Sequence, residues 1–200
     1  MKLYFSPSAC SLAQHISLRE AGLSFDLEKV DLASKKTASG RDYWAINPKG
    51  YVPALELEDG SVLTENQAIS QYVADQRPDA RLAPAYGTME RYRLQEWLGY
   101  VGTELHKTIG ALFDRGLGEA QKAAILERID RRLALVDEAL AGKSYLMGSD
   151  FSVADAYLFT VVRWTSFFQM ELSKFPNLSA FMARVGERPA VKAALEAEKA

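Results

Sequence analysis

The 200-residue chain contains one cysteine, Cys10, and only two histidines, His15 and His106. A single cysteine excludes an intramolecular disulfide, and the histidines have no ligand-like spacing with it, so no metal site is expected. No apolar run reaches the roughly 18 residues that a membrane span requires, so no membrane partner is expected. The first residues lack the apolar stretch and the cleavage site of a secretory signal. These absences together predict a cytoplasmic protein.

The chain also lacks an excess of basic residues. It has 24 Lys and Arg against 26 Asp and Glu, with a formal net charge of −2. A nucleic-acid partner would require a basic surface, so none is expected. Apolar residues make up 48% and charged residues 25% of the chain, which is typical of a folded globular protein. The length allows one large domain or two small ones.

The first 78 residues alternate strand and helix patterns, which predicts an α/β domain. We expect strands over 2–5, 25–32, 54–57 and 62–64, helices over 11–21 and 65–76, a short helix over 42–46 and a loop over 33–40. Asp59-Gly60 predicts a type I′ turn between the two strands of a hairpin, because it supplies positive φ angles. A crossover helix followed by a hairpin gives a mixed sheet.

The second half of the chain is helical in pattern. Residues 79–87 contain Pro84 and little periodicity, and are interpreted as a linker between domains 1–78 and 88–200. Helices are expected over 89–113, 119–140, 152–168, 179–185 and 190–197. The segment 152–168 is apolar almost all round, which predicts that it forms the buried centre of the second domain.

Cys10 is the first candidate for chemistry. It lies between a strand and a helix, close to the unpaired N–H groups and the positive dipole at the helix N-terminus. Such a position lowers the pKa of a thiol and favours the thiolate. The alternative is that Cys10 is only a small buried hydrophobic residue.

Two further segments each allow either a structural or a functional interpretation. Val52-Pro53 precedes a strand, where a cis proline would turn the Val52 backbone towards a site, although a trans proline at a strand start is more common. Thr64-Glu65-Asn66-Gln67 opens a helix whose free N–H groups can hold a carboxylate. The same residues equally fit an ordinary N-cap.

Other polar residues have an ordinary structural explanation when they are considered alone. Lys35 fits a solvated loop lysine, and His106-Lys107 fits the surface of a long helix. Ser152 and Asp155 form a capping box ahead of an apolar run. A buried Asp155 would need N–H donors for its carboxylate, which predicts a structural role for this pair.

Five segments of the chain match one family in their order and spacing. They are residues 2–20, 47–53 (Asn-Pro-Lys-Gly-Tyr-Val-Pro), 63–65, 104–107 and 151–159. The chain thereby resembles the beta-class bacterial glutathione transferases over nearly its whole length. The Asn-Pro-x-Gly-x-Val-Pro and Ser-x-Ala-Asp motifs are shared by many transferase classes, whereas Ser-Ala-Cys-Ser and the His-Lys pair point to the beta class.

The resemblance implies a thioredoxin-like N-terminal domain, an all-helical C-terminal bundle, a homodimer, glutathione as substrate and no cofactor. It implies a cis bond before Pro53 and pairing of Val52 with the peptide backbone of glutathione. Glu65 and the Asn66 N–H would hold the γ-glutamyl end, in keeping with a helix N-terminus. The remaining implied contacts are Lys35 at the glycyl carboxylate, Cys10 and His106 at the sulfur, and Thr103, Glu104 and Lys107 in the same wall.

Three residues depart from the family pattern. Asn66 replaces a usual small residue, Tyr51 replaces a usual glutamine, and Gly99 stands where an asparagine would reach the ligand of the neighbouring subunit. These changes bear on the affinity for glutathione.

The implied reaction is attack of the glutathione thiolate on a hydrophobic electrophile held in a cleft between the domains, with the sulfur anion stabilised by nearby donors. Thiol-disulfide exchange through Cys10 is a second activity and the main rival enzymatic interpretation. The rival from another class is a noncatalytic scaffold of the same fold. The presence of Cys10, Glu65 and His106 favours an enzyme.

Overall fold

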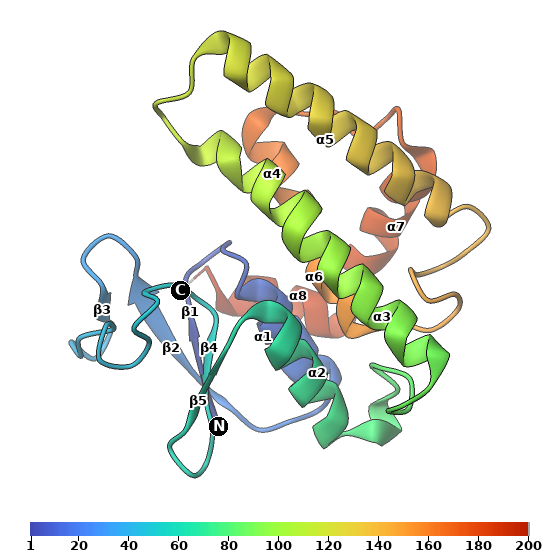
Figure 1. Cartoon of the computed structure of the whole chain (residues 1–200). Helices are drawn as coiled ribbons and strands as arrows, with labels where there is room; N and C mark the ends of the chain where they lie inside the picture. Colours follow the sequence, from blue (N-terminus) through green and yellow to red (C-terminus); the bar gives the residue numbers. More distant parts are fainter. Residues whose placement is uncertain (200) are drawn as a thin grey trace.

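A computed structural model describes residues 1–199 of the chain. It contains a small α/β unit followed by an all-helical unit, which confirms the thioredoxin-like and helical-bundle architecture expected from the sequence (Figure 1). The linker expected over 79–87 lies between helices α2 (Asn66–Gln76) and α3 (Met89–Tyr100).

The N-terminal unit is built on a five-stranded mixed sheet of order β3-β2-β1-β4-β5. β1 is parallel to β2, and the other neighbouring strands pair antiparallel. Helix α1 (Leu12–Glu20) makes the crossover between the parallel strands, and α1 also packs against the helical unit. The strands are β1 (Lys2–Phe5), β2 (Asp26–Asp31), β3 (Lys36–Thr37), β4 (Ala54–Glu56) and β5 (Val62–Thr64).

A long helical rod forms the wall of the C-terminal unit that faces the sheet domain (Figure 1). α3 continues without a break into a π-helical segment, Val101–His106, then α4 (Lys107–Gly110) and a 3₁₀ turn, Ala111–Phe113. The central helix α6 (Val153–Val162) is buried at all ten positions, as its apolar sequence predicts. The other helices are α5 (Glu119–Ala139), α7 (Pro176–Gly186) and α8 (Pro189–Ala197), and a 3₁₀ segment, Arg163–Phe168, follows α6.

A buried arginine fixes the rod against the sheet domain. Arg91 of α3 donates to both carboxylate oxygens of Asp75 at 2.9 Å, and to the carbonyl of Pro84 at 3.1 Å. The Thr88 side chain caps the same helix by accepting from the Arg91 N–H at 3.2 Å. These bonds tie α2, the linker and α3 together, and so set the position of the π-helical segment further along the rod.

Four local expectations are corrected by the structure. Residues 42–46 form a β-bridge, a bend and turns instead of a short helix, because Asp42 bridges to Lys36 and the Tyr43 N–H donates to the Lys35 carbonyl at 2.8 Å. The expected loop 33–40 contains β3. In the hairpin turn only Gly60 has a positive φ, +81°, so the turn is not type I′, which needs two. The expected helix 152–168 is α-helical only to Val162 and then tightens into 3₁₀ geometry.

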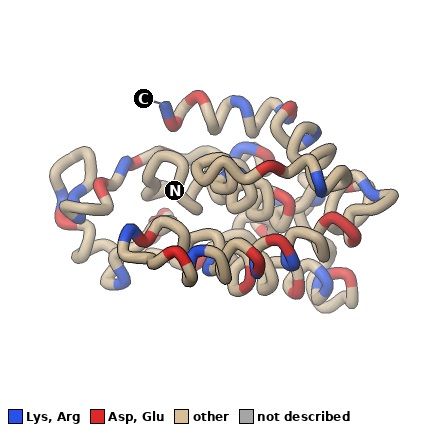
Figure 2. Tube along the Cα trace, turned by 90° about the horizontal axis from the view of Figure 1, so that it is seen from above, with Lys and Arg blue, Asp and Glu red and all other residues tan. Residues whose placement is uncertain are grey.

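Charges of both signs are distributed over the molecule. Lys and Arg are interspersed with Asp and Glu along the helices (Figure 2). Within residues 1–199, no helix is both long and apolar enough to cross a membrane.

Candidate functional site

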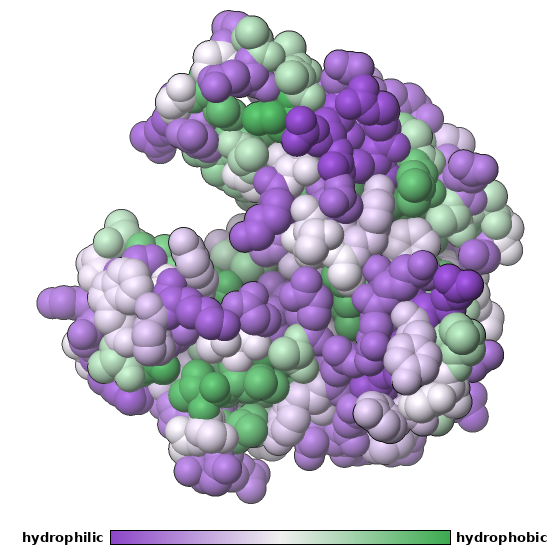
Figure 3. Space-filling view, in the orientation of Figure 1, coloured by the Kyte–Doolittle hydropathy of each residue, from purple (hydrophilic) through white to green (hydrophobic). Residues whose placement is uncertain are grey.

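A cleft separates the sheet domain from the helical rod, and it is visible as a deep notch in the surface (Figure 3). Two cavities adjoin in this region, of about 370 Å³ and about 470 Å³. We call the first the polar pocket and the second the aromatic pocket. Four residues line both of them: Cys10, Tyr51, Val52 and His106. A ligand that reaches from one pocket into the other must therefore pass these side chains.

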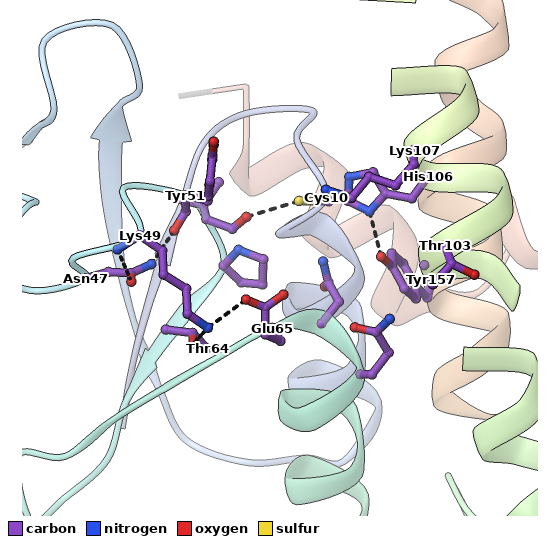
Figure 4. A pocket seen from close by; sticks show the side chains of 15 residues that line it. Cys10, Asn47, Lys49, Tyr51, Thr64, Glu65, Thr103, His106, Lys107 and Tyr157 are labelled. Atoms are coloured by element: carbon purple, nitrogen blue, oxygen red, sulfur yellow. Dashed lines mark hydrogen bonds and ion pairs between the residues drawn. The ribbon is translucent and has the colours of Figure 1, made fainter. Parts of the chain in front are cut away.

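The polar pocket is formed by the loops before β4 and α2 and by the π-helical segment (Figure 4). Its lining contains seven of the nine predicted substrate-contacting residues, and Pro53 besides. The residues are Cys10, Val52, Glu65, Asn66, Thr103, His106 and Lys107. The fold thus brings together residues that lie as much as 97 positions apart, from 10 to 107.

Cys10 lies at the junction of the two pockets, in the turn that precedes α1. Its thiol donates a hydrogen bond to the carbonyl of Val52 at 3.1 Å (Figure 4). Burial raises the pKa of this thiol to about 11, although a hydrogen bond from the Asn66 side chain acts in the opposite direction. The lowered pKa expected from the sequence is therefore wrong, because loss of solvent outweighs the stabilising contacts at the helix N-terminus.

Helix α2 begins at the edge of the polar pocket. Glu65 precedes it with φ of +72°, a region in which residues other than glycine are strained by about 1–3 kcal/mol. Its half-exposed carboxylate pairs with Lys49 at 2.7 Å, and the Lys49 ammonium also donates to Thr64 Oγ1 at 2.9 Å (Figure 4). Asn66, the first helical residue, is buried. The peptide bond between Val52 and Pro53 is cis, as expected.

His106 projects from the π-helical segment towards Cys10 and Tyr157 (Figure 4). Its Nδ1 lies 2.6 Å from the Tyr157 hydroxyl, and its ring packs edge-on against Trp164 at a centroid distance of 4.9 Å. Burial lowers the pKa of His106 to about 4 and raises the pKa of Tyr157. Both side chains are thus neutral at pH 7, and a neutral imidazole still carries one N–H donor.

Two predicted contacts lie outside the polar pocket. Lys35 donates to the carbonyl of Gly50 at 2.7 Å and sits over the rings of Trp44 and Tyr51. Glu104 turns away towards α5, where it pairs with Arg132. The sequence pattern placed Glu104 with its neighbours, but adjacent helical positions face different directions.

Sequence reasoning missed several residues of the pocket lining. Five of them lie in the segments that carry the family resemblance, but nothing in those segments shows which side chains face the pocket. They are Asn47, Lys49, Tyr51, Thr64, Gln67, Gly102 and Tyr157. A Cβ at Gly102 would lie 2.1 Å from Gln67 Nε2, so a larger residue there would require the Gln67 side chain to move.

The aromatic pocket continues from Cys10 towards the end of the rod. Phe113 and Trp164 stand with ring centroids 5.8 Å apart, and half-exposed Phe167 adjoins them. The Trp164 indole N–H donates to the carbonyl of Ser8 at 2.9 Å, which ties this wall to the loop before Cys10. Such a surface offers aromatic faces and little hydrogen bonding, and therefore suits an apolar or aromatic ligand.

Ser152 and Asp155 occupy the buried start of α6 and line neither pocket. Asp155 Oδ2 accepts from the Ser152 N–H at 2.8 Å and from its hydroxyl at 2.6 Å, while Oδ1 accepts from the Leu146 N–H at 2.8 Å. Burial raises the pKa of Asp155 to about 6. The pair joins a helix start to a preceding loop, as a structural role requires.

Comparison with known proteins connects this geometry to a family. Residues 7–76 match the model of the glutathione S-transferase N-terminal domain, and residues 97–189 match that of the C-terminal domain. Glutathione S-transferase GstA of Escherichia coli O157:H7 is 47% identical over 198 residues, which cover 99% of this chain and 98% of that one.

Solved structures agree over the same length. A sphingomonad glutathione S-transferase complexed with glutathione has a TM-score of 0.96 and 47% identity, covering 100% of this chain and 99% of that chain. A bacterial beta-class transferase from Sphingomonas chungbukensis has a TM-score of 0.95 and 49% identity, covering 99% and 98%.

Proposed function

The chain belongs to the glutathione S-transferase family and is similar to its bacterial beta-class members; we propose that it joins the sulfur of glutathione to an apolar electrophile at the junction of its two pockets. The main support for this proposal is that Cys10 and His106 line both the polar and the aromatic pocket. A sulfur held between them faces the peptide-binding side and the electrophile side at once.

The polar pocket supplies complementary groups for each end of glutathione. The Glu65 carboxylate suits the ligand's ammonium, and the free N–H groups at the start of α2 suit its α-carboxylate. We expect the Val52 backbone, which precedes β4 and lines the pocket, to pair with the ligand's peptide. Lys49, which neutralises Glu65 in this structure, and Lys107 are the cations within the pocket lining.

At the sulfur site, neutral side chains donate the hydrogen bonds that stabilise the glutathione thiolate. The Cys10 thiol is protonated at pH 7, since its pKa is raised to about 11, and His106 is a neutral imidazole. Each can donate one hydrogen bond to the glutathione sulfur, and donors to an anion lower the free energy of the thiolate. The thiolate then attacks the electrophile held against Trp164 and Phe113.

The assignment is tested by calorimetry with glutathione and by conjugation of chlorodinitrobenzene. We expect one binding site per subunit and a rate that saturates in both substrates. Absence of heat and of thermal stabilisation at millimolar glutathione would contradict the proposal and favour the noncatalytic scaffold.

Thiol-disulfide exchange is the second candidate function. Cys10 is the only protein sulfur that lines either pocket, and exchange requires a protein thiolate to attack a disulfide. Its raised pKa makes that thiolate scarce at pH 7, so we expect exchange to be slower than conjugation. Measuring the turnover of hydroxyethyl disulfide together with the conjugation rate gives the ratio of the two activities.

We also propose that the chain forms a homodimer, as the family resemblance implies. Three large side chains where the linker meets the rod, Tyr86, Met89 and Tyr92, are more than half exposed. Burying them against a second copy would remove apolar surface from water. Light scattering that gave only a 22.2 kDa species would contradict this. The cytoplasmic location stays a prediction.

A further inference from the structure

Asn66 places a buried amide in the wall of the polar pocket, at a position where the family resemblance leads one to expect a small residue. Its side chain is 5% exposed, and the pocket wall that it lines also contains Cys10 and Tyr157. A buried amide has both a donor end and an acceptor end to satisfy. Which end faces the pocket decides what the residue can do there.

The orientation of the Asn66 amide is fixed by Gln14, a fully buried residue of α1. Gln14 Nε2 lies 3.1 Å from the Asn66 carbonyl and 2.9 Å from Ser70 Oγ. A backbone carbonyl only accepts hydrogen bonds, so the nitrogen of Gln14 and not its oxygen must face it. This arrangement leaves Gln14 Oε1 buried without a partner in the structure.

The same Gln14 nitrogen lies 3.0 Å from Asn66 Oδ1. Rotating the Asn66 amide by half a turn would bring two N–H donors face to face, so the oxygen must point towards Gln14. The Asn66 NH₂ group then points the other way, into the pocket wall shared with Cys10 and Tyr157. In agreement, hydrogen bonding from the Asn66 side chain lowers the pKa of both groups and partly opposes the effect of burial.

We propose that the Asn66 side-chain amide donates a hydrogen bond to the sulfur of bound glutathione, and that Gln14 is the positioning residue that aims this donor. The proposal rests on the proposed function, because it takes the sulfur to lie beside Cys10. A neutral N–H favours the thiolate over the thiol, so Asn66 adds a third donor to those of Cys10 and His106. The backbone N–H of Asn66 remains available to bind the α-carboxylate of glutathione.

Several ionisable groups surround the same point and contribute to any titration measured there. They are the side chains of Cys10, Lys49, Tyr51, Glu65, His106, Lys107 and Tyr157. The variants below leave these groups unchanged, so a difference between variants reports on the amide.

The test is the ionisation of bound glutathione, followed by the ultraviolet absorbance of the thiolate as the pH is raised, with the protein alone as the baseline. In Asn66→Ala we expect the apparent pKa of the bound thiol to rise by about one unit, a tenfold smaller thiolate fraction at pH values below that pKa. The dissociation constant for glutathione, measured where the thiol is un-ionised, should not change, since the backbone N–H is kept.

Two further variants separate the role of Asn66 as the donor from the role of Gln14, which orients it. Asn66→Asp keeps an acceptor for Gln14, suits a helix N-terminus and replaces the donor by oxygen, so the pKa of the bound thiol should rise further than in Asn66→Ala. Gln14→Leu keeps the size of the residue but releases the amide, and should give a smaller rise in the same direction. If Gln14→Leu does not fold, the two Asn66 variants still decide the matter.

The outcomes distinguish this proposal from the function on which it rests. A chain that binds no glutathione overturns both. A chain that binds and conjugates glutathione, but whose bound thiol keeps its pKa in Asn66→Ala, overturns only the role of the amide. Weakened binding with an unchanged thiol pKa would assign the Asn66 side chain to the γ-glutamyl carboxylate instead, which also overturns the proposal.

Discussion

The start of α6 is buried in the protein, whereas the start of α2 opens onto the polar pocket, and both have ionisable groups beside them. At α6 the Asp155 carboxylate accepts three hydrogen bonds from Ser152 and Leu146. Near α2, the Cys10 thiol donates to the Val52 carbonyl and accepts from the Asn66 side chain, while His106 Nδ1 hydrogen-bonds the Tyr157 hydroxyl. Both groups face cavities that a ligand can fill.

Burial shifts the pKa values of both sites, so a shifted pKa does not by itself mark a catalytic group. The pKa of Asp155 rises to about 6 and that of Cys10 to about 11. The difference lies in the open space beside Cys10 and His106, which line both pockets, whereas Asp155 lines neither pocket. Changes at α6 should therefore alter stability, and changes around Cys10 should alter binding and rate.

The largest effect is expected for Asp155→Ala, which removes an acceptor from two buried backbone N–H groups. Each orphaned donor costs about 1–3 kcal/mol, so the free energy of unfolding, measured with urea, should fall by about 2–6 kcal/mol. Ser152→Ala removes one hydroxyl and should cost less, about 0.5–2 kcal/mol. Normal stability with lost turnover in either variant would break the comparison.

Asp155→Asn is a matched control that cannot titrate, so the pH dependence of stability in the two proteins can be compared. The pKa of Asp155 is higher in the folded chain, about 6, than the ordinary value of 3.8, so the folded state binds more protons between these values. The wild-type chain should therefore lose stability relative to Asp155→Asn as the pH rises from about 4 to about 6. Urea unfolding at several pH values measures the sign.

Glu65→Ala should weaken glutathione binding by about 1.5–3 kcal/mol, the range for a hydrogen bond to a charged group. The carboxylate is half exposed and pairs only with Lys49 in the free chain, so the free energy of unfolding should hardly change. Calorimetry measures the loss of binding free energy, and urea unfolding checks that the stability is unchanged. A stability loss as large as that of Asp155→Ala would mean that Glu65 supports the fold.

His106→Ala should lower kcat/KM for conjugation by about tenfold, or about 1.4 kcal/mol of transition-state stabilisation. Since the pKa of His106 is lowered to about 4, the imidazole stays neutral from pH 5 to 8, and the wild-type rate profile should show no step from its titration. A step near pH 6.5 that vanishes in His106→Ala would show that the imidazole becomes charged.

The smallest effect on conjugation is expected for Cys10→Ala, about threefold or less, because one neutral donor is lost while the sulfur of glutathione remains the nucleophile. The same variant should lose nearly all turnover of hydroxyethyl disulfide, which needs a protein sulfur. Both assays on one protein decide the role of Cys10. Equal loss of both activities would make it a direct participant in conjugation, and equal retention would reduce it to packing.

Much of the fold was predictable from the chain itself. The 3.6-residue periodicity and the apolar sequence of 153–162 predict a buried helix, and strand and helix patterns in the first 78 residues predict a mixed sheet. The short helix expected over 42–46 was wrong because Asp42 and Tyr43 pair with Lys36 and Lys35 instead, a contact that the local pattern does not show. The type I′ turn was wrong because the backbone angles of a turn also depend on loop length.

The candidate site was predicted in part. Motifs gave Cys10, Val52, Glu65, Asn66 and His106, which the structure brings into one pocket. Tyr157 and Lys49 were missed because no local pattern distinguishes a pocket-facing side chain from a core or surface one. Glu104 was expected in the pocket wall, but its pairing with Arg132 comes from a helix 28 residues later.

The sequence by itself determined which residues carry the chemistry, since residue type, order and spacing are local properties. Only the tertiary structure decided their charge states. A helix N-terminus predicts a low pKa for Cys10, but the pKa is raised because strands and helices far apart in the chain exclude water from the thiol. The direction of the Asn66 amide likewise follows from Gln14 on another helix, a contact between residues 52 positions apart.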